Sequence, residues 1–375
     1  MLFKVKQEGC YIRRGDKNNV ERLKDTLIRK CTIDKIANIN FLWYYINVMK
    51  IENIYDEEIV MDTIIFLEPV FAERIWGGRN LEKFNYDIPE GNIGEAWVIA
   101  AHENGSSLIK NGELKGLTLK EAYEKRPELF TKKKYDKFPL LVKILDASDY
   151  LSVQVHPEDD YARINENGEL GKTECWYVLD AKENAELIYG HTAKTKEEFN
   201  RGIDEEKWDD LFIREKVKKG DFFYIPAGTL HAIGAGNLIY EVQQNSDTTY
   251  RVYDYDRTDK DGNKRELHIE KTKDVTAVPF EKVQLEQEVY EVGNIKVTQL
   301  AEERYFGVYK IEVSGEAELT KNDTGNLFTV LEGQGRIKVE DVVYDIKKGD
   351  SFILTTQCSD CLLDGEMLLI GSYDR

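Results

Sequence analysis

The sequence predicts a mainly β protein, built as β-barrel or jelly-roll units with helical insertions and a partly helical N-terminal extension. Short apolar or alternating runs follow one another from Phe66 onward, for example at residues 96–99, 140–145 and 222–225. Gly, Asp and Asn residues separate these runs, as turns separate the strands of a sandwich or barrel. An internal repeat and two helix-start signals complete the prediction.

The internal repeat indicates two related β units. Residues 219–227 return late in the chain as residues 348–356, and each copy is a Gly-Asp turn that leads into an apolar strand. The second copy follows an apolar run and a Gly-rich hairpin at residues 330–336. No histidine follows Gly349 in the sequence, so we expect the second unit to be free of metal.

Two segments carry the capping pattern of a helix start. Thr118 precedes Glu121 by three residues, and Thr195 precedes Glu198 by the same spacing. The second helix is expected to lead into a further helical stretch that places three apolar residues on its buried side: Trp208, Leu211 and Phe212. These helices interrupt the β pattern as insertions.

A chain of 375 residues has room for two or three units. We expect an N-terminal extension at 1–60, a larger unit that carries the candidate site at 61–275, and a smaller β unit at 276–375. Residues 20–36 suit an amphipathic helix and residues 39–46 form a short apolar patch. Because Met61 opens a segment that looks like a protein start, we expect the extension to be accessory or the result of a mis-called start. A helical cap on the body is the alternative.

The charge and the cysteine content argue against a nucleic-acid-binding, membrane-bound or secreted protein. The formal net charge of −18 argues against a general attraction to nucleic acid or to anionic membranes. No apolar run approaches the ~20 residues of a membrane helix, and no secretory leader is evident. Five scattered cysteines fit a reducing, cytoplasmic setting. Cys358 and Cys361 form a lone CxxC pair, for which ordinary thiols are favoured over structural zinc.

The stretch SVQVHPED at residues 152–159 places polar groups on one face of a strand. Alternation directs Ser152, Gln154 and His156 to the same side, and Pro157 then ends the strand. Two interpretations are compatible with this pattern: a hydrogen-bonded polar group in a core, or ligands of a metal ion. The second needs further ligands from elsewhere in the chain.

Further ligand types occur at His231 and Glu174. The spacing of Gly220, Pro226, Gly228 and His231 matches the second cupin motif, G-x5-P-x-G-x2-H, so this segment resembles the cupins. Pro and Gly fix a tight bend that presents the imidazole rigidly at a strand start. With Glu174 from another apolar run, the set of two imidazoles, a carboxylate and an amide oxygen suits a borderline divalent ion such as Zn²⁺ in an open site.

Seven segments in the same order resemble the type I mannose-6-phosphate isomerases, in their short bacterial form. The resemblance runs from about Phe66 to the C-terminus and rests on residues 73–78, 93–97, 138–143, 154–157, 171–174, 226–231 and 246–254. It implies two cupin-like units, one zinc ion per chain and the interconversion of mannose 6-phosphate and fructose 6-phosphate through a cis-enediol or enediolate. A small sugar phosphate would be the partner, without nucleic acid or membrane, in a monomer or a homodimer.

The resemblance also assigns roles to residues of this chain. The implied zinc ligands are Gln154, His156, Glu174 and His231. Arg251 matches the active-site arginine, which can stabilise negative charge without losing its proton. The other expected members are Lys172 and Asp247 as proton-transfer or ring-opening groups, and Ser152, Lys143 and Trp76 as substrate contacts.

Two other functions are compatible with the motifs. An Fe²⁺-dependent cupin oxygenase would use two histidines and a carboxylate, although Gln154 is an unusual addition to such a site. A non-catalytic sugar-phosphate-binding cupin would keep the fold without turnover. A complete ligand set together with Arg251 favours the isomerase, because a binding protein has little use for both.

Overall fold

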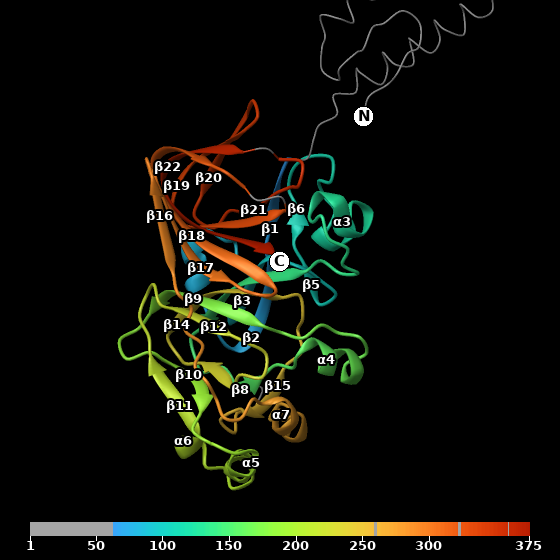
Figure 1. The fold of residues 1–375 in the computed structure, drawn as a ribbon, viewed down its shortest axis with the longest axis vertical. Coiled ribbons are helices and arrows are strands. Elements are labelled where there is room, and N and C mark those ends of the chain that lie inside the picture. Colours follow the sequence, from blue (N-terminus) through green and yellow to red (C-terminus); the bar gives the residue numbers. More distant parts are fainter. Residues whose placement is uncertain (1–62, 259–260, 322–323, 359) are drawn as a thin grey trace, which may run out of the picture. The chain divides into compact units, whose positions relative to one another are not determined.

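The computed structural model describes residues 63–375, except 259–260, 322–323 and 359, and the predicted extension at 1–60 therefore lies outside the described residues. Strands dominate this part of the chain, as predicted (Figure 1). No helix within the described ranges combines the length and the apolar character needed to cross a membrane.

The described residues form three antiparallel sheets and one two-stranded ribbon. The six-stranded sheet has the order β12-β9-β14-β7-β3-β2, with bounds Phe222–Ile225, Glu174–Ala181, Asn237–Gln244, Leu140–Ala147, Ile93–Ile99 and Val70–Gly78. The five-stranded sheet has the order β11-β10-β13-β8-β15, with bounds Phe212–Lys216, Glu186–His191, His231–Ile233, Val153–Val155 and Tyr250–Tyr253. The ribbon pairs β4 (Ala101–His102) with β5 (Gly105–Ser106).

The nine-stranded sheet holds the C-terminal strands and two early ones. Its path is β16-β17-β18-β22-β19-β21-β1-β6, and β20 pairs with β19. The bounds in that order are Glu288–Val292, Ile295–Glu302, Phe306–Leu319, Cys361–Asp374, Asn326–Val339, Ser351–Leu354, Ile64–Glu68 and Leu108–Ile109, with β20 at Val342–Lys347. Short helices connect the strands: η1 (Asn80–Phe84), α3 (Leu119–Lys125), η2 (Pro127–Leu129), α4 (Asp159–Asn165), α5 (Lys196–Asp204), α6 (Trp208–Leu211) and α7 (Ile269–Val275).

The three sheets lie in layers. The five-stranded and six-stranded sheets enclose one apolar core, to which Trp176 and Ile239 come from one sheet and Leu187 and Tyr189 from the other. The opposite face of the six-stranded sheet packs on the nine-stranded sheet through a second core. Figure 1 shows the nine-stranded sheet at one end of the body and helices α5, α6 and α7 at the other. The six-stranded sheet is therefore buried on both faces.

Strand β1 joins the sheet that the C-terminal residues build. It pairs antiparallel with β21, with Ile65 opposite Ile353, and on its other side with β6. The nine-stranded sheet thus includes segments from before residue 276. The domain boundary at 275/276 stays a prediction. The chain passes from the nine-stranded to the six-stranded sheet between β1 and β2, well before that boundary.

The internal repeat has a common backbone shape in both copies. Gly220 and Gly349 both adopt a left-handed conformation, with φ of 92° and 97°. The following Asp221 and Asp350 each accept a 2.9 Å hydrogen bond from a backbone N–H three residues earlier. Each turn then leads into a strand, β12 or β21. A glycine is required at this turn because a Cβ atom disfavours positive φ.

The insertions begin as helices, with one difference between them. Thr118 and Glu121 form a complete capping box at α3. At α5, Thr195 accepts a hydrogen bond from the N–H of Glu198, but the Glu198 carboxylate bonds the N–H of Lys194. The further helix, α6, ends at Leu211, so the prediction of a helical Phe212 is wrong. Its ring is instead buried at the start of β11, which pairs with β10.

We expect Ile65→Ala to lower the free energy of unfolding by about 2–5 kcal/mol, because Ile65 is fully buried in the core between two sheets. Ile164→Ala is the matched control, since Ile164 is 76% exposed on α4 and alanine favours helix there. Denaturant unfolding of both variants measures the difference. Equal stabilities would contradict a structural role for β1 in the sheet.

Candidate metal centre

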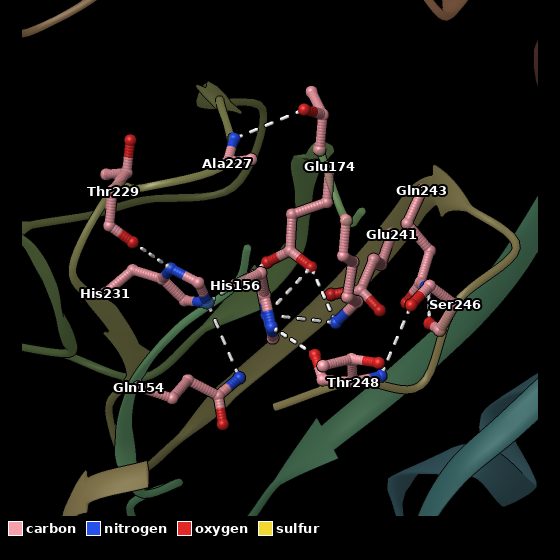
Figure 2. Close-up of polar contacts among 12 residues, drawn as sticks. Gln154, His156, Glu174, Ala227, Thr229, His231, Glu241, Gln243, Ser246 and Thr248 are labelled. Carbon is pink, nitrogen blue, oxygen red and sulfur yellow. Dashed lines mark hydrogen bonds and ion pairs between the residues drawn. The ribbon is translucent and has the colours of Figure 1, made fainter. Parts of the chain in front are cut away.

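Three ligand-type side chains converge in the space between the five-stranded and six-stranded sheets. His156 follows β8, Glu174 begins β9 and His231 begins β13 (Figure 2). All three residues are buried, and their ligand atoms lie within 4.8 Å of one another. The strand register explains this convergence, because His231 pairs with Gln154 on β8 while Glu174 belongs to the facing sheet.

Backbone carbonyls orient both imidazoles. His156 Nδ1 lies 2.7 Å from the carbonyl oxygen of Thr248, and His231 Nδ1 lies 2.9 Å from that of Thr229. A carbonyl only accepts, so each Nδ1 carries the proton and each Nε2 keeps its lone pair. Both lone pairs are therefore available within the cluster, which is the tautomer that metal-ligating histidines use.

The Glu174 carboxylate faces these lone pairs. Its Oε1 lies 3.3 Å from His231 Nε2 and its Oε2 lies 3.5 Å from His156 Nε2. Oε1 is buried and accepts no hydrogen bond. Acceptors this close repel one another unless a cation lies between them. The donor set therefore fits a divalent metal ion.

Lys172 supplies a cation at one side of the cluster. Its Nζ lies 2.8 Å from Glu174 Oε2 and 3.1 Å from His156 Nε2. Burial lowers the pKa of Lys172. The negative charges of Glu174 and Glu241 raise it by a larger amount, so the pKa lies above its usual value. In this arrangement the amine is protonated.

Both histidines are neutral in this environment. Burial, followed by the charges of Lys172 and His231, holds the pKa of His156 well below its usual value. Burial lowers the pKa of His231 to about 4, although the Thr229 carbonyl opposes the shift. Because a protonated imidazole cannot ligate a metal, burial keeps both rings ready to bind.

Gln154 extends the cluster toward the five-stranded sheet. Its Nε2 lies 3.4 Å from His231 Nε2, and its Oε1 lies 3.4 Å from the hydroxyl of Ser152. The amide nitrogen faces the imidazole lone pair, so ligation through the amide oxygen would require the group to turn over. Such a half-turn exchanges two atoms of nearly the same size.

Arg251 and Ser152 lie beside this face. Arg251 pairs with Gln154 across β15 and β8, and its Nε donates to the Ser152 hydroxyl at 3.1 Å. Its Nη1 donates to the carbonyl oxygen of Glu266 at 2.9 Å. Arg251 forms no ion pair with a carboxylate among the ion pairs of the described residues. Its positive charge is therefore available to a ligand.

Lys143 lies inside the six-stranded sheet and has two acidic neighbours. Its Nζ is 3.7 Å from Glu241 Oε1 and 4.0 Å from Glu95 Oε2, and it stacks 4.7 Å from the ring of Trp97. Glu241 also accepts a 2.8 Å hydrogen bond from the indole of Trp176. The sequence interpretation missed Glu241 and Glu95. A single charged residue in the apolar run 237–242 was the available signal for Glu241.

Asp247 and Trp76 have different surroundings. Asp247 lines a cavity of about 290 Å³ together with Arg74, Trp97 and Asn104, and it accepts a 3.0 Å hydrogen bond from Asn104. Burial raises the pKa of Asp247. The charge of Lys143 and the hydrogen bond from Asn104 lower it by a larger amount, so the pKa lies below its usual value and the carboxyl is charged. Trp76 packs instead in the core between the two sheets, with an exposed fraction of 4%.

Paired sheets that hold two histidines and a glutamate at or next to their strand ends define a protein of the cupin class with a candidate metal centre. Two family models match this chain: the catalytic domain of type I phosphomannose isomerase over residues 64–185, and the cupin domain of mannose-6-phosphate isomerase over residues 296–374. The chain belongs to the type I mannose-6-phosphate isomerase family.

Named relatives support this membership along most of the chain. Mannose-6-phosphate isomerase ManA of Bacillus subtilis is 50% identical over 309 residues, which is 82% of this chain and 98% of the relative. The mannose-6-phosphate isomerase of Streptococcus mutans is 48% identical over 312 residues, with 83% and 98% covered.

Solved structures share the fold. The crystal structure of mannose 6-phosphate isomerase from Bacillus subtilis is 47% identical, with a TM-score of 0.82, and the match covers 83% of this chain and all of that one. Phosphomannose isomerase from Salmonella typhimurium is 16% identical with a TM-score of 0.67, over 84% of this chain and all of that one. The second likeness concerns the fold alone.

We expect His231→Ala to reduce the metal content of the purified protein at least tenfold, because it removes one buried ligand-type nitrogen. His191→Ala is the control. His191 is also buried, but its ring lies against Phe199 and its Nε2 faces the carbonyl of Ala277. Elemental analysis measures metal per chain, and circular dichroism checks the fold. Full metal content in folded His231→Ala would exclude His231 as a ligand.

Proposed function

We propose that this chain interconverts mannose 6-phosphate and fructose 6-phosphate with the help of a bound divalent metal ion. The observation that carries the proposal is the set of buried lone pairs from His156, Glu174 and His231 in a chain of this family. Aldose–ketose isomerisation removes the proton at C2 of the aldose and returns a proton to C1. The enediolate between these steps needs positive charge near its oxygens.

We propose Zn²⁺ as the ion, held by Gln154, His156, Glu174 and His231. Two nitrogens, one carboxylate and one amide oxygen are ligands that zinc accepts, and an incomplete protein shell leaves room for a substrate oxygen. When bound, such an ion would polarise the oxygens of the substrate and favour the neutral amine of a neighbouring lysine.

We assign proton transfer to Lys172. Its Nζ already lies within hydrogen-bond distance of Glu174 and His156, so its position is fixed without help from the substrate. A neutral amine at this place can take the proton from C2, and the resulting ammonium can return it to C1. Asp247 lines the neighbouring cavity and carries a carboxylate suited to opening the sugar ring.

We assign charge stabilisation to Arg251, which retains its proton at any working pH. Ser152 bonds Arg251 and would contact the same end of the substrate. Lys143 and Trp76 were expected to touch substrate as well. Since Lys143 is held between Glu95 and Glu241, and Trp76 packs in the core, we propose that both support the site from behind.

We place the protein in the cytoplasm, where sugar phosphates are metabolised. Cys175, Cys358 and Cys361 are free thiols, as a reducing compartment allows. A monomer or a homodimer remains the prediction for its assembly.

Chelation tests the proposed function directly. The purified protein should convert mannose 6-phosphate to fructose 6-phosphate, lose this activity after complete metal removal, and regain it when Zn²⁺ is returned. A coupled enzyme that consumes fructose 6-phosphate reports the rate. Absence of turnover in the metal-loaded protein would exclude the isomerase, and undiminished turnover in the metal-free protein would exclude metal assistance.

We expect Arg251→Ala to lower kcat about 100-fold or more, in the range found when one preorganised stabiliser of developing charge is removed. The metal content should stay unchanged, since Arg251 is not among the proposed ligands. Arg163→Ala is the control, because Arg163 lies exposed on α4 and forms an ion pair with the exposed Asp160. Steady-state kinetics with both sugar phosphates measures the effect, and wild-type kinetics in Arg251→Ala would refute the assignment.

A further inference from the structure

A tyrosine from the C-terminal part of the chain reaches the segment that follows His156. Tyr305 lies in the turn between β17 and β18 of the nine-stranded sheet, and its hydroxyl donates to Asp159 Oδ2 at 2.9 Å. Asp159 is the first residue of α4, three positions after His156. Burial, reinforced by Asp159, raises the pKa of Tyr305 to about 12, so the phenol stays protonated and keeps donating.

The other oxygen of the same carboxylate holds the segment that carries Lys172 and Glu174. Asp159 Oδ1 accepts hydrogen bonds from the N–H of Gly171 and from the side-chain amide of Gln244, both at 2.9 Å. The Gln244 side-chain oxygen in turn accepts from the N–H of Thr173 at 2.9 Å. One carboxylate therefore positions both ends of the short segment before Glu174.

The same network continues to the other ligand-bearing loops. The Thr173 hydroxyl accepts from the N–H of Ala227 at 3.2 Å, and the N–H of Gly228 donates to the carbonyl of His156 at 2.8 Å. Close packing leaves little freedom, since a Cβ on Gly171 would lie 2.5 Å from the backbone nitrogen of Asp159. These hydrogen bonds therefore link three segments to one another: the loop before Glu174, the loop before His231 and the segment after His156.

We propose that Tyr305 is a positioning residue for the metal centre, through Asp159 and the segment 171–173. The inference rests on the proposed function, which makes Glu174 a metal ligand and Lys172 the proton carrier. The C-terminal unit then contributes to the reaction. Its Tyr305 orients the Asp159 carboxylate, and this carboxylate in turn holds the backbone next to Lys172 and Glu174. Mutation of a group that is hydrogen-bonded to a metal ligand commonly lowers metal affinity about 10–100-fold. Tyr305 is separated from the ligands by Asp159 and the segment 171–173, so we expect a smaller effect.

The test removes only the phenolic oxygen. In Tyr305→Phe the ring remains, and we expect metal to dissociate about threefold to tenfold faster into excess chelator. We also expect faster hydrogen–deuterium exchange at residues 157–175 in the metal-free protein, and a several-fold loss of kcat with a smaller change in KM. The melting temperature should match that of the control variant.

Tyr309→Phe is that control. Tyr309 lies on β18, and its hydroxyl donates to the Glu302 carboxylate at 2.7 Å and lies 3.2 Å from the Tyr373 hydroxyl. Its loss therefore removes a phenol–carboxylate bond within the nine-stranded sheet. It should leave exchange at residues 157–175 and metal dissociation unchanged. If Tyr305→Phe behaves like Tyr309→Phe in both measurements, the positioning role is overturned.

Asp159→Asn gives a second route to the same answer. If Tyr305 acts through Asp159, the double variant should dissociate metal no faster than Asp159→Asn alone, whereas multiplied effects would overturn the proposed path. Hydrogen exchange needs neither metal nor substrate. A wild-type protein without turnover would therefore refute the proposed function, while the exchange data would still decide the coupling of Tyr305 to the segment 157–175.

Discussion

The mutual repulsion of buried lone pairs is the constraint on which the site depends. His156, His231 and Glu174 are buried and direct acceptor atoms toward one another. Burial of unpaired acceptors is costly, and a cation is the group that relieves all three at once. Lys172 partly meets this need, since its ammonium touches both Glu174 and His156. A divalent ion would meet it completely.

The rest of the architecture holds these acceptors in place against their repulsion. Carbonyl groups of Thr229 and Thr248 fix the imidazole tautomers. The two facing sheets supply ligands from opposite sides, so neither sheet can slide without separating them. The nine-stranded sheet packs behind the six-stranded one and so keeps the Glu174 strand covered on its other face. Stability and site geometry therefore depend on the same packed layers.

Charge is distributed to match this chemistry. The chain is acidic overall, with a formal net charge of −18, yet the interior around the site alternates acidic and basic groups. Lys143 lies between Glu95 and Glu241, and Lys172 lies beside Glu174. Arg251 differs from these lysines because its contacts are a hydroxyl and a carbonyl. It is thus the cation best placed to meet an anionic ligand in an acidic protein.

The sequence alone determined the β class, the repeat of Gly-Asp turns and the ligand-type residues, because these depend on strand alternation and local turn chemistry. The same alternation places Cys175 in the core on the other face of the sheet from Glu174. Tertiary structure decided what depends on pairing between distant segments. Glu241 and Glu95 meet Lys143 only through sheet register, Trp76 joins a core instead of a pocket, and Phe212 leaves its helix to pair in β11. Tyr305 reaches Asp159 across 146 positions of sequence, a contact that no local pattern encodes.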